Sequence, residues 1–64
     1  MIYVQCLDDG KSYGFDAKTA YEAMRKMLYT LNIKRNDENA VINKTESGLH
    51  LWFEHSGKTY AARI

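Results

Sequence analysis

The side chains best able to bind another molecule lie near the carboxyl end of the chain. Trp52 has His50 and Glu54 two residues away on either side, and Arg63 follows in the next alternating segment. Side chains alternate along a β-strand, so these four are expected on one face of a sheet. Tryptophan and arginine are enriched among the residues that dominate binding energy at protein interfaces. We therefore predict a protein-contact site at Trp52, His50, Arg63 and Glu54.

Two other interpretations of Trp52 are open. A base of a single-stranded nucleic acid could stack on the indole ring, with Arg63 available to the phosphate backbone. Alternatively, Trp52 packs beneath the first hairpin or a loop, because large aromatic side chains usually bury most of their surface. The sequence leaves the exposure of Trp52 open.

A second group of cations and tyrosines lies on the outer face of an expected helix and in the segment after it. Its members are Arg25, Lys26, Tyr29, Lys34 and Arg35. Cations interleaved with aromatic side chains can follow a phosphate backbone, so this group favours nucleic-acid binding as the alternative function. Carboxylates such as Glu22 and Asp37 dilute its positive charge, and an ordinary solvated helix face has the same composition.

Metal binding and catalysis are not expected. The metal-binding candidates Cys6, His50 and His55 contain no pair at metal-ligand spacing, and the two histidines fall on opposite faces of one strand. Asp8 and Asp9 suit a turn. No nucleophile with a base is visible, and so short a chain has little depth for a pocket of several hundred Å³. We predict a non-enzymatic protein without metal or cofactor.

Composition restricts the class of protein. The formal net charge is +1, with both signs interspersed, which argues against strong attraction to nucleic acid or acidic membranes. No stretch approaches the roughly 20 apolar residues that span a bilayer, so no membrane partner is expected. The single cysteine suits a reducing compartment and predicts a cytoplasmic location. The length of 64 residues predicts one small domain over residues 1–64.

One helix is predicted over Thr19–Leu31. Apolar side chains recur there at the spacing that keeps them on one helix face: Ala20, Ala23, Met24, Met27, Leu28 and Leu31. Thr19 and Glu22 fit a capping box, in which the threonine hydroxyl accepts from the amide three residues on. Asp16 is an alternative cap one turn earlier. The apolar stripe predicts a helix that packs on a sheet.

A hairpin is predicted at the amino terminus. Residues 1–7 have the alternation of a strand, and Asp9-Gly10 is a strong turn signal because glycine accepts positive φ. The pairs expected for a two-residue turn are Cys6 with Tyr13 and Val4 with Phe15.

Three further strands are predicted after the helix. They cover Ala40–Lys44, Leu49–His55 and the segment after Ser56-Gly57, a second candidate for a two-residue turn. The pairs expected across that turn are Leu51 with Ala62, Trp52 with Ala61, Phe53 with Tyr60, Glu54 with Thr59 and His50 with Arg63.

These elements predict an α+β fold of two layers, in the order β-β-α-β-β-β, with the helix packed on one face of an antiparallel sheet. The other face of the sheet is expected to be at least partly open. The first hairpin could join the later strands in one sheet, or pair through its edge in a homodimer. The predicted function is a small interaction module that binds another protein through the open face or an edge strand. A nucleic acid is the alternative partner.

Overall fold

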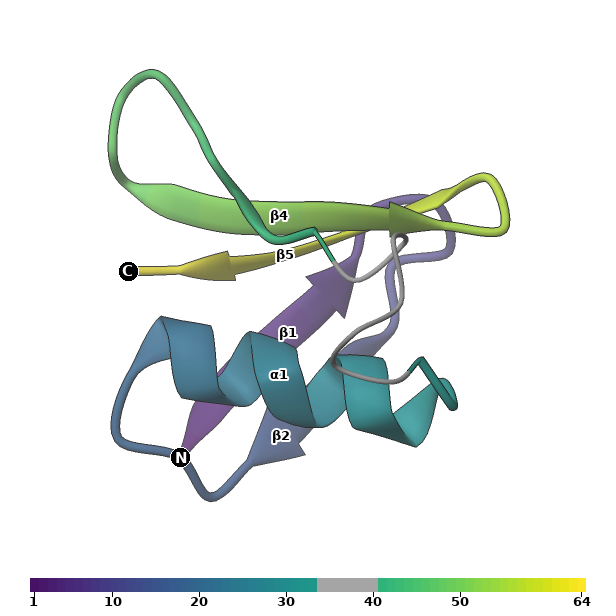
Figure 1. Ribbon diagram of the computed structural model, residues 1–64, viewed down its shortest axis with the longest axis horizontal. Coiled ribbons are helices and arrows are strands. Elements are labelled where there is room, and N and C mark those ends of the chain that lie inside the picture. The colour runs from purple at the N-terminus through teal and green to yellow at the C-terminus, as the bar shows by residue number, and fades with distance from the viewer. Residues whose placement is uncertain (34–40) are drawn as a thin grey trace.

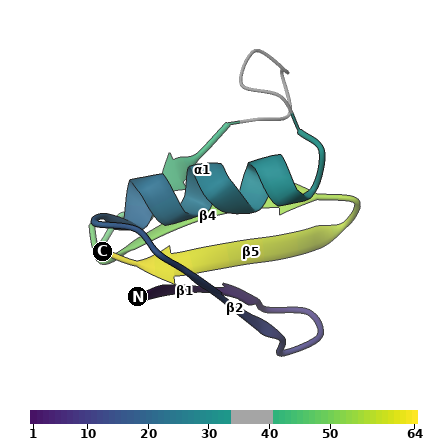
Figure 2. The same ribbon diagram turned by 90° about the horizontal axis from the view of Figure 1, so that it is seen from below.

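The predicted two-layer α+β fold is confirmed. The computed structural model describes residues 1–33 and 41–64. Its elements are β1 (Ile2–Cys6), β2 (Ser12–Phe15), α1 (Ala20–Thr30), β3 (Asn43–Lys44), β4 (His50–His55) and β5 (Lys58–Arg63). The strands form one antiparallel sheet in the order β2-β1-β5-β4-β3, and α1 covers one of its faces (Figures 1 and 2). No helix within the described ranges has the length and apolar character to cross a bilayer.

The helix begins where the sequence predicts. Thr19 has extended backbone angles, and its hydroxyl accepts a hydrogen bond from the backbone N–H of Glu22 at 3.1 Å. The Glu22 carboxylate accepts from the N–H of Lys18 at 3.3 Å, one residue before the amide that a capping box would use. Thr19, and not Asp16, is therefore the cap. The helix ends at Thr30, one residue earlier than predicted.

The apolar stripe of α1 forms the core with one face of the sheet. Ala20, Ala23, Met24, Met27 and Leu28 are buried in the helix. They belong to one cluster with Val4, Cys6, Phe53, Tyr60 and Ala62 of the sheet. The rings of Phe53 and Tyr60 stack with their centroids 5.1 Å apart. The helix therefore covers the apolar face of the sheet and leaves the opposite face uncovered.

The predicted register of the first hairpin is wrong by two residues. Val4 pairs with Tyr13, and Ile2 pairs with Phe15. The loop is longer than two residues, because the N–H of Gly10 donates to the carbonyl of Cys6 at 2.9 Å. Gly10 has φ of 75° and forms a bulge at the end of the turn. An even shift moves each side chain to the next position on the same face, so the predicted faces are retained.

Asp8 and Asp9 both support this loop. Asp9 Oδ1 accepts from the N–H of Lys11 at 2.9 Å, and this backbone hydrogen bond lowers the pKa of the Asp9 carboxyl. Asp8 Oδ2 accepts from the N–H of Thr59 at 2.6 Å, which fixes the loop to β5. The two carboxylates thus serve the turn that the sequence indicates.

The first hairpin joins the later strands through β1 and β5. Gln5 pairs with Ala61 and Cys6 with Tyr60, and the N–H of Leu7 donates to the carbonyl of Thr59 at 2.8 Å. This pairing settles the question that the sequence left open. The strands form one continuous sheet, and β1 lies inside it with β2 at the edge.

The β4–β5 hairpin has the predicted register. All of the expected pairs are present, from His50 with Arg63 to Glu54 with Thr59. The turn residues Ser56 and Gly57 have φ of 51° and 77°, the positive values that a two-residue turn of this type requires.

The strand before β4 is shorter than predicted. β3 contains Asn43 and Lys44, which pair with Trp52 and Leu51. Ala40, at the start of the predicted strand, lies outside the described residues.

Tyr60 makes the stability of this core sensitive to alkaline pH. Burial removes water from its hydroxyl, which raises the pKa above the ordinary value of about 10. At lower pH the folded and unfolded chains both keep the proton. As the pH rises past about 10, the unfolded chain ionises first. The free energy of unfolding therefore falls until the pH passes the folded-state pKa.

We expect a Tyr60→Phe variant to lose less stability than the wild type above a pH of about 10. The substitution keeps the aromatic ring that stacks on Phe53 and removes only the hydroxyl. Urea denaturation at a series of pH values measures the difference. Parallel loss of stability in the two proteins would contradict the assigned role of the Tyr60 hydroxyl.

Candidate binding face

The face opposite α1 carries a row of side chains that crosses the whole sheet. The register places Ser12 opposite Gln5, Gln5 opposite Ala61, Ala61 opposite Trp52, and Trp52 opposite Asn43. Each strand contributes one residue to this row. Alternation along each strand puts them on the face that the helix does not cover.

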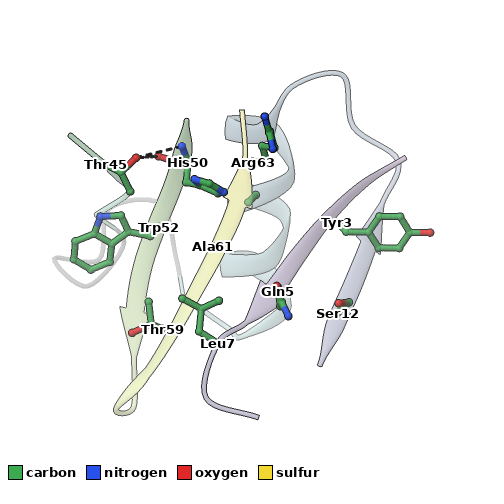
Figure 3. A pocket seen from close by; sticks show the side chains of 11 residues that line it. Tyr3, Gln5, Leu7, Ser12, Thr45, His50, Trp52, Thr59, Ala61 and Arg63 are labelled. Atoms are coloured by element: carbon green, nitrogen blue, oxygen red, sulfur yellow. Dashed lines mark hydrogen bonds between the residues drawn. The ribbon is translucent and has the colours of Figure 1, made fainter. Parts of the chain in front are cut away.

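A depression of about 500 Å³ lies on this face. Its lining comes from all five strands and their ends: Tyr3, Gln5, Leu7, Ser12, Thr45, His50, Trp52, Thr59, Ala61, Ala62 and Arg63. Figure 3 shows Ala61 and Gln5 between Trp52 at one side and Tyr3 at the other. The small side chain of Ala61 keeps the middle of the surface low. The volume of the depression lies in the range of small-molecule sites. It exceeds what the chain length led us to expect.

Aromatic and aliphatic side chains mark the two sides of the depression. Trp52 is partly buried on β4, and β5 separates its strand from β1, so the first hairpin does not cover it. On the far side, Tyr3 is 61% exposed, and Leu7, which lies beside Thr59 (Figure 3), is 58% exposed. The exposure of Trp52, left open by the sequence, is thus intermediate, and the indole ring is available to a partner.

His50 and Arg63 lie opposite each other at one end of the depression. The N–H of Thr45 donates to the backbone carbonyl of His50 at 3.0 Å, which holds the start of β4 in place. Both side chains are exposed. Glu54 is on the same face but opposite Thr59, outside the lining. Three of the four residues predicted for the site therefore share the depression, and the fourth lies beyond it.

The sequence-based site omits the residues that β1 and β2 contribute. These are Tyr3, Gln5, Leu7 and Ser12. Three of them could have been found from the alternation along β1, where Tyr3, Gln5 and Leu7 face away from Val4 and Cys6. The missing information was the β1–β5 pairing, which brings that face beside Trp52.

The second predicted group is only partly described. Arg25, Lys26 and Tyr29 line another depression of about 500 Å³, between α1 and Phe15 of β2. Lys34 and Arg35 lie outside the described residues. Lys26 forms an ion pair with Glu22 at 3.8 Å, so part of the positive charge of this group is compensated on the helix itself.

The metal and nucleophile candidates are separated by the sheet. Cys6 is a free thiol in the core with no exposed surface, while the His50 side chain projects from the opposite face. Within residues 1–33 and 41–64, no three His, Cys, Asp or Glu side chains gather into a metal-binding group. Cys6 packs as a small apolar residue.

Comparisons of the chain with protein-family models, with curated proteins and with solved structures gave no match.

Proposed function

We propose that this protein is a small non-enzymatic module that binds another protein through the open face of its sheet. The observation that carries the proposal is the placement of Trp52, Tyr3 and Leu7 around a depression that α1 leaves uncovered. Accessible aromatic side chains beside an arginine are typical of the residues that dominate protein interfaces. No cofactor enters the proposal, and the single cysteine supports a cytoplasmic location.

A protein partner suits this face better than a nucleic acid. Among the residues that line the depression, Arg63 is the one permanent cation, and Glu54 projects from the same face. Phosphate backbones are held by several lysines and arginines together. A single strand remains the second candidate, because Trp52 and Tyr3 offer ring faces on which bases stack.

The test is affinity capture from the native host, followed by titration with the purified captured protein. We expect Trp52→Ala to weaken that binding at least about tenfold, as loss of a central aromatic contact does. Tyr21→Ala is the matched control, because it removes an exposed aromatic side chain from α1 that lines neither depression. Equal binding by wild type and Trp52→Ala would exclude the open face as the contact surface.

A salt titration separates the two partner classes. If single-stranded oligonucleotides bind at low salt and the binding weakens steeply with added salt, the partner is a nucleic acid and not a protein.

A further inference from the structure

The open face of the sheet carries a cation at one end and a carboxylate at the other. Arg63 of β5 lies opposite His50 of β4, and Glu54 of β4 lies opposite Thr59. Four residues separate the two ends, which corresponds to about 13 Å along the strands. Arg63 and Glu54 are both exposed, and neither forms an ion pair with another described residue. Each is therefore available to an opposite charge on a partner.

The two ends are arranged evenly about the middle of the face. The row that contains Trp52, Ala61 and Gln5 crosses the three inner strands. Each of these strands presents one side chain two residues before the row and another two residues after it. The three resulting pairs are His50 and Glu54 around Trp52, Arg63 and Thr59 around Ala61, and Tyr3 and Leu7 around Gln5. Figure 3 shows His50 and Arg63 at one end and Thr59 and Leu7 at the other.

A second copy of the chain is complementary to this face when a two-fold axis runs along the row. Such an axis reverses the strand direction, so the cationic end of one copy lies over the acidic end of the other. Glu54 of the second copy then lies over His50 and next to Arg63, and the symmetry repeats this contact at the other end. Tyr3 of one copy meets Leu7 of the other. The strands of the two sheets are nearly aligned, as in β-sandwiches.

The direction of the axis follows from the charges. A two-fold axis parallel to the strands would bring the Arg63 ends of both copies together, which opposes association. With the axis along the row, residues of the row meet their own counterparts. The amide of Gln5 suits this position because it both donates and accepts hydrogen bonds. The two Trp52 rings also meet there, and the low surface at Ala61 leaves space beside them.

The size and charge of the whole chain also favour a second copy. The formal net charge is +1, so two copies repel each other only weakly. A chain of 64 residues has a thin core, and small domains often complete theirs by oligomerisation. Contact between two open faces removes Trp52, Tyr3 and Leu7 from water, which supplies apolar burial that one copy lacks.

We propose that the partner of the open face is a second copy of this chain, packed face to face with the two helices outside. The inference rests on the proposed function, because it identifies the protein that the open face binds. The dimer has four layers, in the order helix, sheet, sheet, helix. Ion pairs between Arg63 of each copy and Glu54 of the other fix its register.

The first test is the molecular mass of the full chain, measured by sedimentation equilibrium over a range of concentrations. We expect dimers at about 0.1 mM and their dissociation on dilution. Trp52 is the only tryptophan of the chain, so its fluorescence emission should move to longer wavelength as the dimer is lost. Trp52→Ala should weaken self-association at least about tenfold.

Charge reversal tests the contact between Arg63 and Glu54. Arg63→Glu places two carboxylates together at each end of the interface, and Glu54→Arg places two guanidinium groups together. We expect each variant alone to self-associate at least about tenfold more weakly than the wild type. An equal mixture of the two variants should regain dimers, because each chain then meets opposite charges on the other. Mixing could not restore an ion pair that forms within one chain.

The matched control is Lys18→Glu, which makes the same change of charge at an exposed lysine before α1 and should leave self-association unchanged. A wild type that is monomeric at about 1 mM would overturn the proposal. Dimers that persist in Trp52→Ala and in both reversal variants form through another surface and would also overturn it. A mixture of the reversal variants that stays monomeric would reject the Arg63–Glu54 register.

These outcomes are distinct from failure of the proposed function. If the chain is monomeric and Trp52→Ala loses the protein captured from the host, the open face binds a different protein and the second copy is rejected. The proposed function itself fails when Trp52→Ala binds the captured protein as tightly as the wild type does.

Discussion

Replacement of Phe53 by alanine is expected to destabilise the fold by about 3–5 kcal/mol. Phe53 has no exposed surface, and its ring stacks on Tyr60 of the neighbouring strand. The substitution removes this contact and leaves a cavity in the middle of the sheet. A domain of 64 residues has a total stability of only about 3–10 kcal/mol. The loss therefore removes a large part of the stability of the domain.

Urea denaturation followed by far-ultraviolet circular dichroism measures this loss, with Glu54→Ala as the control on the same strand. Glu54 is exposed, and its replacement should change the free energy of unfolding by no more than about 0.5 kcal/mol. A loss below about 1 kcal/mol for Phe53→Ala would mean that the neighbouring side chains refill the site.

Phe53 also illustrates which parts of the fold are accessible from sequence. Its pairing with Tyr60 follows from one local feature, the Ser56-Gly57 turn, because a two-residue turn fixes the register of both strands. The β4–β5 hairpin is therefore predicted pair by pair. Similarly, the helix start follows from Thr19 and from a stripe with a clear period.

The first hairpin shows where the same reasoning fails. Asp9-Gly10 has the composition of a two-residue turn, but Gly10 instead forms a bulge after a longer loop. This longer loop is stabilised by the hydrogen bond from the N–H of Thr59 to Asp8. That partner lies far away in the sequence, so no local pattern around the turn reports it.

The candidate binding face depends on the same kind of distant contact. Trp52, His50 and Arg63 could be placed on one face from the register of a single hairpin. Tyr3 and Leu7 become their neighbours only through the pairing of β1 with β5, which joins the two ends of the chain without a turn between them. Half of the face could thus be predicted, and the other half required the topology.

Replacement of Leu28 by alanine is expected to cost about 2–5 kcal/mol. Leu28 is almost completely buried in the stripe that α1 packs against the sheet. The backbone N–H of Ile33 donates to the carbonyl of Leu28 at 2.9 Å. That hydrogen bond survives the substitution, so the loss measures side-chain packing and not the end of the helix.

Tyr29→Ala is the neighbouring control, because it removes a larger but exposed side chain from the same helix and should cost no more than about 0.5 kcal/mol. Thermal and urea denaturation of the two variants give the comparison. The open face provides a second criterion, since α1 lies on the opposite side of the sheet from Trp52 (Figure 3). The folded fraction of Leu28→Ala should therefore retain wild-type affinity at that face. A reduced affinity per folded molecule would show that packing of α1 also shapes the surface around Trp52.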